Sequence, residues 1–274
     1  MNALDNMDQE SLRQVANAWK GALLFGALAL LMGSISCRKD AAMTENRVAT
    51  RPVAEAIAEA DTLYAVRSDL SKVRQGLVAL RQAQADDATN YELAWRLAKF
   101  NYYLGAHSPE SGEPEKSFRE GIEAGKLAVR LQDGKPDGHF WLGANYGGNA
   151  QISTLSGYSD IDYIKQEMEA VLKLNEGYQS GSAYMVLGQV YLQAPRVFGG
   201  DTQKAVEYLE KGLRFGPNNS LLRLHLAEAY AELSRNEDAR KQIDHLLAMK
   251  PAPGYEPEHE EAVALAKKLQ EKIK

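Results

Sequence analysis

The sequence has little of what builds a disulfide-braced, metal-bound or catalytic protein. Its 274 residues include a single cysteine, Cys37, and nine prolines, and only 8% of them are aromatic. One cysteine excludes an internal disulfide and any metal site made of several cysteines. The five histidines show no HExxH spacing, and no GxSxG elbow or GxxxxGK[ST] phosphate loop occurs. We therefore expect a non-enzymatic protein with no cofactor and no metal ion.

A long basic run is also missing. The formal net charge is −5, and charged residues of both signs alternate along the chain, which is typical of solvated helix faces. A nucleic-acid partner would need a basic footprint, so we expect none. Runs that alternate apolar and polar residues, the pattern of strands, are absent too, whereas Ala, Leu, Glu, Lys, Gln and Arg are abundant. The sequence therefore predicts an all-α protein.

Two consecutive segments between residues 181 and 253 follow one helix-turn-helix pattern. In the second, which starts at Ser220, Leu226, Ala227 and Tyr230 fall at positions 7, 8 and 11, and Ala239 at position 20. This is the spacing of a tetratricopeptide repeat of about 34 residues. Small residues at positions 8 and 20 let the two helices of a repeat approach closely, while large apolar residues fill the remaining space. The first segment matches through Leu187, Gly188, Tyr191, Ala205, Leu209, Gly212 and Pro217.

The junction between these two repeats carries helix stop and start signals. Gly216 can adopt the left-handed conformation after a helix, and Pro217 cannot continue one. Asn219 or Ser220 can then cap the next helix.

The same pattern extends toward the N-terminus. Helical spacing begins at Pro52, and Leu142, Gly143 and Tyr146 occupy repeat positions 7, 8 and 11. Gly121 and Gly125 fall inside a predicted helix, where each costs about 1 kcal/mol relative to alanine. Their presence indicates close helix contact or a backbone face left clear for another purpose.

These patterns predict a tetratricopeptide-like helical-hairpin solenoid of about five helix pairs. Residues 258–273 carry one apolar stripe and are expected to form a C-terminal capping helix. We expect three parts: a signal or anchor segment over residues 1–37, a tether over 38–51 and the solenoid over 52–274.

Cys37 follows an uncharged run of 16 residues, Gly21 to Ser36. The run is shorter than the roughly 20 residues that cross a bilayer and closer to the apolar core of a secretory signal. A lone cysteine behind small residues is typical of a bacterial lipoprotein, in which the cysteine is lipidated. An uncleaved membrane anchor, a cleaved soluble form and a buried structural cysteine stay as alternatives. The leading hypotheses place the protein in the cell envelope, on the periplasmic side.

Two insertions interrupt the repeat spacing, at residues 147–160 and 194–201. Both fall at helix turns of adjacent units, so we expect loops that lie near each other on one edge. Repeat insertions commonly map to a binding face, although Asp160 and Asp201 are also explained as caps of the following helices. Core packing is the simpler explanation of most aromatic residues, and lining of a concave groove is the alternative. The candidate binding residues are Trp141, Tyr146, Tyr158, Tyr184, Pro195, Phe198, Gly199, Gly200 and Asp201.

The run of features from residue 136 to 253 resembles a known family. Its most specific parts are the Tyr-Gln-Ser-Gly motif at 178–181, the pair Leu187-Gly188, and Pro195 followed by Gly-Gly-Asp at 199–201. These resemble the T component, or TatT, of tripartite ATP-independent periplasmic (TRAP) transporters. The resemblance implies a helical periplasmic lipoprotein that assists a solute-binding protein and holds a hydrophobic ligand in a channel. A general repeat adaptor for envelope proteins is the alternative.

Overall fold

The structure is a computed structural model that describes residues 52–153 and 157–273. All described elements are helical, and this part of the chain contains no strand. Cys37 and the apolar run before it lie outside the described residues. None of the described helices is long and apolar enough to cross a membrane.

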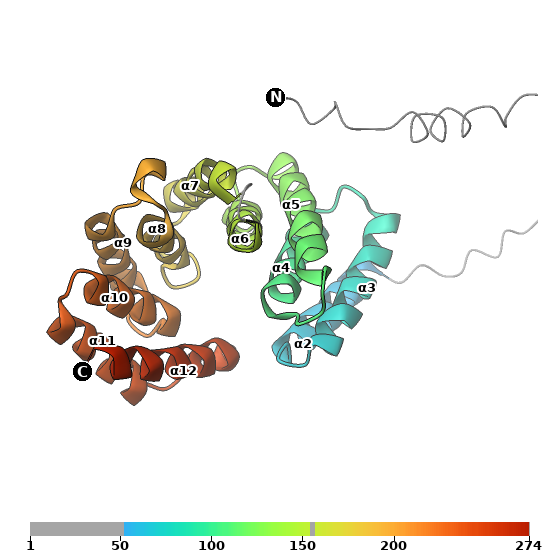
Figure 1. The fold of residues 1–274 in the computed structure, drawn as a ribbon. Coiled ribbons are helices and arrows are strands. Elements are labelled where there is room, and N and C mark those ends of the chain that lie inside the picture. Colours follow the sequence, from blue (N-terminus) through green and yellow to red (C-terminus); the bar gives the residue numbers. More distant parts are fainter. Residues whose placement is uncertain (1–51, 154–156, 274) are drawn as a thin grey trace, which may run out of the picture. The chain divides into compact units, whose positions relative to one another are not determined.

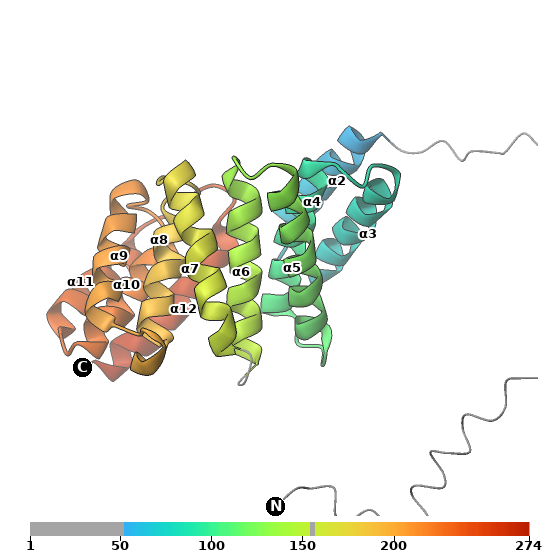
Figure 2. The same ribbon diagram turned by 90° about the horizontal axis from the view of Figure 1, so that it is seen from above.

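Eleven α-helices and one short 3₁₀ helix follow one another in the described residues (Figure 1). They are α2 (Val53–Ala65), α3 (Leu70–Asp86), α4 (Tyr91–His107), α5 (Glu113–Leu131), α6 (Pro136–Ile152), α7 (Gly157–Leu174), α8 (Ser182–Gln193), η1 (Arg196–Phe198), α9 (Thr202–Phe215), α10 (Ser220–Glu232), α11 (Asn236–Ala248) and α12 (Glu256–Lys272). Each consecutive pair from α2/α3 to α10/α11 forms an antiparallel hairpin, and α12 follows the last pair (Figure 2). The prediction of five pairs plus a capping helix is confirmed.

Small residues set the distance between neighbouring helices, both within a hairpin and between successive hairpins. A Cβ added to Gly188 in α8 would lie 2.5 Å from Cγ of Leu209 in α9. A Cβ on Gly121 in α5 would lie 2.0 Å from Oδ1 of Asn145 in α6. Glycine at these positions therefore allows a helix contact that any side chain would block. Of the two explanations for the helical glycines, close contact is the one that applies to Gly121.

The predicted capping residues behave in two different ways. The Asn219 side chain accepts a hydrogen bond from the backbone N–H of Leu222, and Asp201 accepts one from that of Lys204. Gly216, however, ends α9 at φ −129° and not in the left-handed region, so that expectation was wrong. Glycine is required there because an added Cβ would lie 2.0 Å from the carbonyl oxygen of Ser180.

The first insertion is not a loop over most of its length. Helix α6 continues to Ile152 and α7 already begins at Gly157, so the additional residues mainly lengthen two helices. Asp160 is therefore inside the first turn of α7 and does not cap it. Its carboxylate instead accepts a hydrogen bond from Nδ2 of Asn149 at 2.8 Å, which joins the two extended helices.

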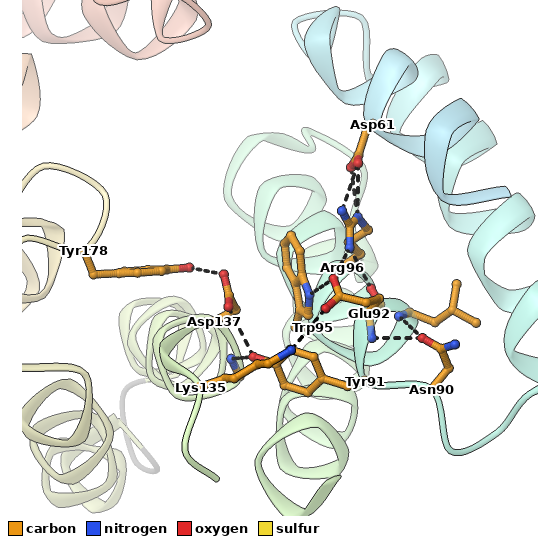
Figure 3. Close-up of polar contacts among 11 residues, drawn as sticks. Asp61, Asn90, Tyr91, Glu92, Trp95, Arg96, Lys135, Asp137 and Tyr178 are labelled. Carbon is orange, nitrogen blue, oxygen red and sulfur yellow. Dashed lines mark hydrogen bonds and ion pairs between the residues drawn. The ribbon is translucent and has the colours of Figure 1, made fainter. Parts of the chain in front are cut away.

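Polar contacts connect successive hairpins at the edge where α4 and α6 begin (Figure 3). The Arg96 guanidinium lies 3.0 Å from the carboxylate of Asp61. Tyr178 donates to Asp137 at 2.8 Å, and Tyr91 donates to the other oxygen of the same carboxylate at 3.2 Å. Burial and the charge of Asp137 raise the pKa of Tyr178 far above its ordinary value. Both tyrosines therefore stay protonated and act as donors.

Helix α12 does more than cover the end of the array. Ala262 and Ala266 are fully buried against α10 and α11, as the apolar stripe predicts. Its N-terminal part also reaches the start of the array, where Arg67 donates through Nε to Glu258 at 3.0 Å and through Nη2 to the carbonyl of Gly254 at 2.6 Å. We call this contact the α2–α12 clasp. The first hairpin and the last helix are thereby linked across 191 residues of sequence.

Candidate functional site

A cavity of about 470 Å³ lies among the first helices of the hairpins. Its lining comes from α2, α4, α5, α6, α8, α9, α10 and α12, together with the turns before α8 and α10. The volume is within the range of roughly 300–1,000 Å³ that is typical of small-molecule sites. No single repeat contains this site, because its walls meet only when the whole array has folded.

Aromatic side chains dominate the wall of the cavity. The ring centroids of Tyr102 and Trp141 are 5.7 Å apart, and Phe140 meets Trp141 edge-on at 5.0 Å. The α5 ring of Phe118 reaches the cavity because α6 has glycine at position 148, where a Cβ would lie 2.1 Å from that ring. The aromatic lining residues are Tyr64, Tyr102, Tyr103, Phe118, Phe140, Trp141, Phe215 and Tyr255.

The α12 side of the cavity is polar. His107 donates from Nδ1 to the carbonyl of Tyr103 at 2.8 Å, and its Nε2 lies 3.9 Å from Glu261. Burial alone would lower the pKa of His107, but Glu261 and the Tyr103 carbonyl more than offset this effect and raise it. Reciprocally, His107 lowers the pKa of Glu261, whose carboxylate is therefore ionised at neutral pH.

The α2–α12 clasp borders this polar side. The Arg67 side chain is only 3% exposed, and the Glu258 side chain is 22% exposed. The guanidinium also lies 4.9 Å from the ring centroid of Tyr64 and 5.7 Å from that of Tyr103. Desolvation lowers the pKa of Arg67, but Glu258 raises it by more, so the guanidinium stays protonated. The clasp is thus a buried, hydrogen-bonded ion pair next to the cavity wall.

A smaller cavity of about 240 Å³ adjoins the first. Gly147, Gln151, Val186 and Gln189 line both spaces. The second cavity extends to Tyr158 and to the residues that precede η1. It therefore connects the central site to the edge where the two insertions lie.

The two insertions meet, as the sequence predicts. The rings of Tyr158 and Phe198 stack with centroids 4.2 Å apart and planes inclined by 6°. Both side chains are nearly half exposed, and Val197 is 86% exposed. Gly199 adopts φ +85° and ends η1, and Asp201 starts α9. Pro195 precedes η1, and Gly200 is tightly enclosed, because a Cβ there would lie 1.8 Å from the Ala194 carbonyl oxygen.

The other predicted site residues are divided between the cavity and the packing. Trp141 lines the central cavity. Tyr146 stacks on Tyr163 at 5.1 Å and contributes to neither cavity. Tyr184 is buried and donates to Glu176 at 2.8 Å, and burial together with that carboxylate raises its pKa to about 12. The structure therefore does not bring the predicted residues into one site.

Sequence reasoning missed the residues that α12 and α2 bring to the cavity. Glu258, Glu261 and Tyr64 are distant in sequence from the repeat positions that predicted the groove, and no local pattern marks them. His225 of α10 is buried, and its Nε2 lies 2.7 Å from Nε2 of Gln189, which lines both cavities. In residues 52–153 and 157–273, no group of three or more His, Cys, Asp or Glu is placed to hold a metal ion.

The hairpin array with its repeat spacing defines a tetratricopeptide-type protein. Among solved structures it is similar to TTC0263, a tetratricopeptide protein of Thermus thermophilus, at 19% identity and a TM-score of 0.59, covering 78% of this chain and 98% of that one. It is also similar to PilF of Pseudomonas aeruginosa, at 18% identity and a TM-score of 0.51, covering 81% and 94% of the two chains. At these identities the likeness shows the fold alone. No curated protein matches the sequence.

The family is identified by the sequence itself. A profile of the TRAP transporter T-component family matches residues 113–274, more than half of the chain. The chain belongs to this family, as the motifs between residues 136 and 253 predict.

Proposed function

We propose that the protein is an extracytoplasmic, membrane-tethered T component that binds an apolar small molecule and a solute-binding protein, and that it acts without catalysis. Family membership supports a place in a transport system. The tether is proposed from the apolar run and Cys37. Labelling cells with a fatty acid would test it, because label that persists after Cys37→Ala would contradict lipidation at that residue.

The observation that carries this proposal is the central cavity with its aromatic wall. An adaptor that recognises an extended peptide needs an open concave surface, whereas here α12 spans that surface and is held by the α2–α12 clasp. A concave space of about 470 Å³ with eight aromatic residues in its wall suits a compact apolar molecule.

Gly147 provides a direct test of ligand binding. It lies in the middle of α6, lines both cavities, and has no atom within 4 Å of an added Cβ. Gly147→Leu should therefore fold, since leucine favours a helix over glycine, while its side chain occupies the space of the ligand. We expect the uncharged fluorescent probe N-phenyl-1-naphthylamine to bind this variant about tenfold or more weakly than the unchanged protein, because overpacking costs about 1–3 kcal/mol.

Gln166→Leu is the matched control, because Gln166 is exposed on α7 and lines neither cavity. It should bind the probe as the unchanged protein does. Equal binding by Gly147→Leu would place the probe elsewhere and contradict the cavity as the ligand site.

The edge formed by Tyr158, Val197 and Phe198 is the surface that we propose for the solute-binding protein. Single exposed apolar side chains are common on any protein surface, but a cluster of exposed aromatic and aliphatic side chains is typical of a surface that binds a partner. This edge also adjoins the second cavity, so a partner bound there would lie beside a route to the ligand.

The partner is tested by affinity capture from envelope extracts with Phe198→Asp and, as control, Val78→Asp. Val78 is 52% exposed on α3, far along the chain from the insertions. The unchanged protein and Val78→Asp should recover a solute-binding protein, and Phe198→Asp should not. Recovery of an unrelated envelope assembly in place of a solute-binding protein would favour the alternative of a general repeat adaptor.

A further inference from the structure

The charged groups of the central cavity are of one sign apart from histidine. Glu258 and Glu261 line it from α12, and none of the described lining residues is lysine or arginine. An anionic headgroup in this space would approach carboxylates without a permanent cation to bind it. The lining therefore distinguishes between apolar molecules by the charge that they carry.

The two carboxylates differ in how far they are neutralised. Glu258 is paired with Arg67, whose three guanidinium nitrogens all donate hydrogen bonds, because Nη1 also donates to the carbonyl of Tyr64 at 3.3 Å. Among the described residues, Glu261 is paired with His107 alone, at 3.9 Å, and its side chain is 52% exposed. The negative charge that is less fully neutralised in the cavity is therefore that of Glu261.

The nearby basic side chains do not offer an alternative site for an anion. His107 already uses Nδ1 on the Tyr103 carbonyl, and His259 uses Nδ1 on the Ser220 hydroxyl at 2.8 Å. Lys99 lies behind the wall with Nζ 3.7 Å from the ring centroid of Tyr64, and burial lowers its pKa to about 8. It is not part of the lining.

The aromatic wall extends the preference for positive charge. Tyr102 lines the cavity between the end that holds Glu258 and Glu261 and Trp141. The ring centroids of Tyr102 and Trp141 are 5.7 Å apart. Its pKa is raised by burial and then by the charges of Glu261 and Glu258, so the negative field reaches the aromatic wall. Electron-rich ring faces attract cations, most strongly where water is excluded. The acidic end and the tyrosine faces thus favour the same kind of group.

We propose that the ligand of this cavity is an apolar molecule with an amino or quaternary ammonium group, the positive charge lying at Glu261 and the apolar body against Tyr102, Phe118 and Trp141. This inference rests on the proposed ligand-binding function and specifies its ligand class. It excludes simple fatty acids as preferred ligands.

Three probes with the same ten-carbon chain test the inference by isothermal titration calorimetry below their micelle concentrations: decyltrimethylammonium, 1-decanol and decanoate. The full-length protein should bind the cation most tightly and decanoate most weakly. Glu261→Gln should weaken binding of the cation by roughly two- to fivefold, the effect of a pair at a half-exposed carboxylate, and leave 1-decanol unchanged. Glu260→Gln removes the same charge from the exposed neighbouring position on α12 and should change none of the three.

The outcomes separate this inference from the proposed function. If decanoate binds as tightly as the cation, or if Glu260→Gln weakens the cation as much as Glu261→Gln does, the charge preference is refuted while the apolar site stands. If none of the three probes binds, the apolar site itself is refuted, and the inference fails with it.

Discussion

Replacing Gly188 by alanine measures the close helix contact on which the repeat depends. In α8 a Cβ at this position would lie 2.5 Å from Cγ and 2.7 Å from Cδ2 of Leu209. Leu209 is fully buried, and the contacting Cγ is the branch point of its side chain, so the residue cannot turn away without moving α9. The substitution should therefore overpack the hairpin.

The expected magnitude follows from two opposing effects. Alanine is favoured over glycine in a helix by about 1 kcal/mol, whereas overpacking a well-packed core costs about 1–3 kcal/mol. Gly147→Ala provides the reference, because the same helix preference applies there and nothing lies within 4 Å of the added Cβ. Gly147→Ala should raise the free energy of unfolding by about 1 kcal/mol. The free energy of unfolding of Gly188→Ala should be lower than that of Gly147→Ala by roughly 1–3 kcal/mol, which corresponds to about 2–12 °C in Tm.

Thermal unfolding followed by circular dichroism measures both variants, and a second substitution identifies the cause. Leu209→Ala alone should cost about 2–5 kcal/mol through the cavity that it leaves. On that background the Gly188 methyl group has space, so Gly188→Ala should become neutral or stabilising. If Gly188→Ala is as stable as Gly147→Ala, or if it destabilises the Leu209→Ala protein as much as the unchanged one, the contact argument is wrong.

Three further predictions concern polar contacts. Glu258→Gln leaves Arg67 buried without its counter-charge and should lower the free energy of unfolding by about 3 kcal/mol, the lower end for a broken buried pair because Glu258 is partly exposed. Amide hydrogen exchange at the start of α12 should become faster. Unchanged protection there would show that the clasp does not hold the helix. In urea unfolding, Asp201→Ala should lower the free energy of unfolding by about 0.5–2 kcal/mol, because it removes the cap of α9. Asp201→Asn should keep most of that stability, since asparagine also caps helices. Equal losses in the two variants would argue against capping. The hydrogen bond to Glu167 raises the pKa of His139. The contribution of protonated His139 to the free energy of unfolding is therefore complete below the ordinary pKa of about 6.5, and it is lost as the pH rises through the raised pKa of the folded protein. Urea unfolding between pH 5 and 9 should show this loss, and His139→Gln should remove that part of the slope.

The fold could be predicted from the sequence because every repeat has the same local spacing of small and large apolar residues. Ala239 at position 20 and Ile243 at position 24 are fully buried, as the tetratricopeptide spacing predicts. The cap at Asn219 depends on residues within one turn and was also predictable. Gly216 was predicted to end its helix for the wrong reason, because the atom that excludes a side chain, the Ser180 carbonyl oxygen, lies in the turn between α7 and α8.

The candidate functional site was much harder to predict from the sequence than the fold. The insertions were expected to form the binding edge, and the structure does bring Tyr158 and Phe198 together. The first insertion, however, lengthens α6 and α7, since residues up to Ile152 and from Gly157 continue helical hydrogen bonding. Periodicity shows which face of each helix is apolar, but it does not show whether a face meets another helix or a cavity.

Local spacing in the sequence thus determines the hairpins, their order and the small residues between them, because those depend on neighbours within about one repeat. Only the tertiary structure decides that α12 returns to Arg67, that a cavity forms among the hairpins, and that Glu261 lines it. These features depend on the accumulated rotation of five hairpins, to which every contact along the array contributes. The ligand site is therefore a property of the whole array, and no motif in a single repeat encodes it.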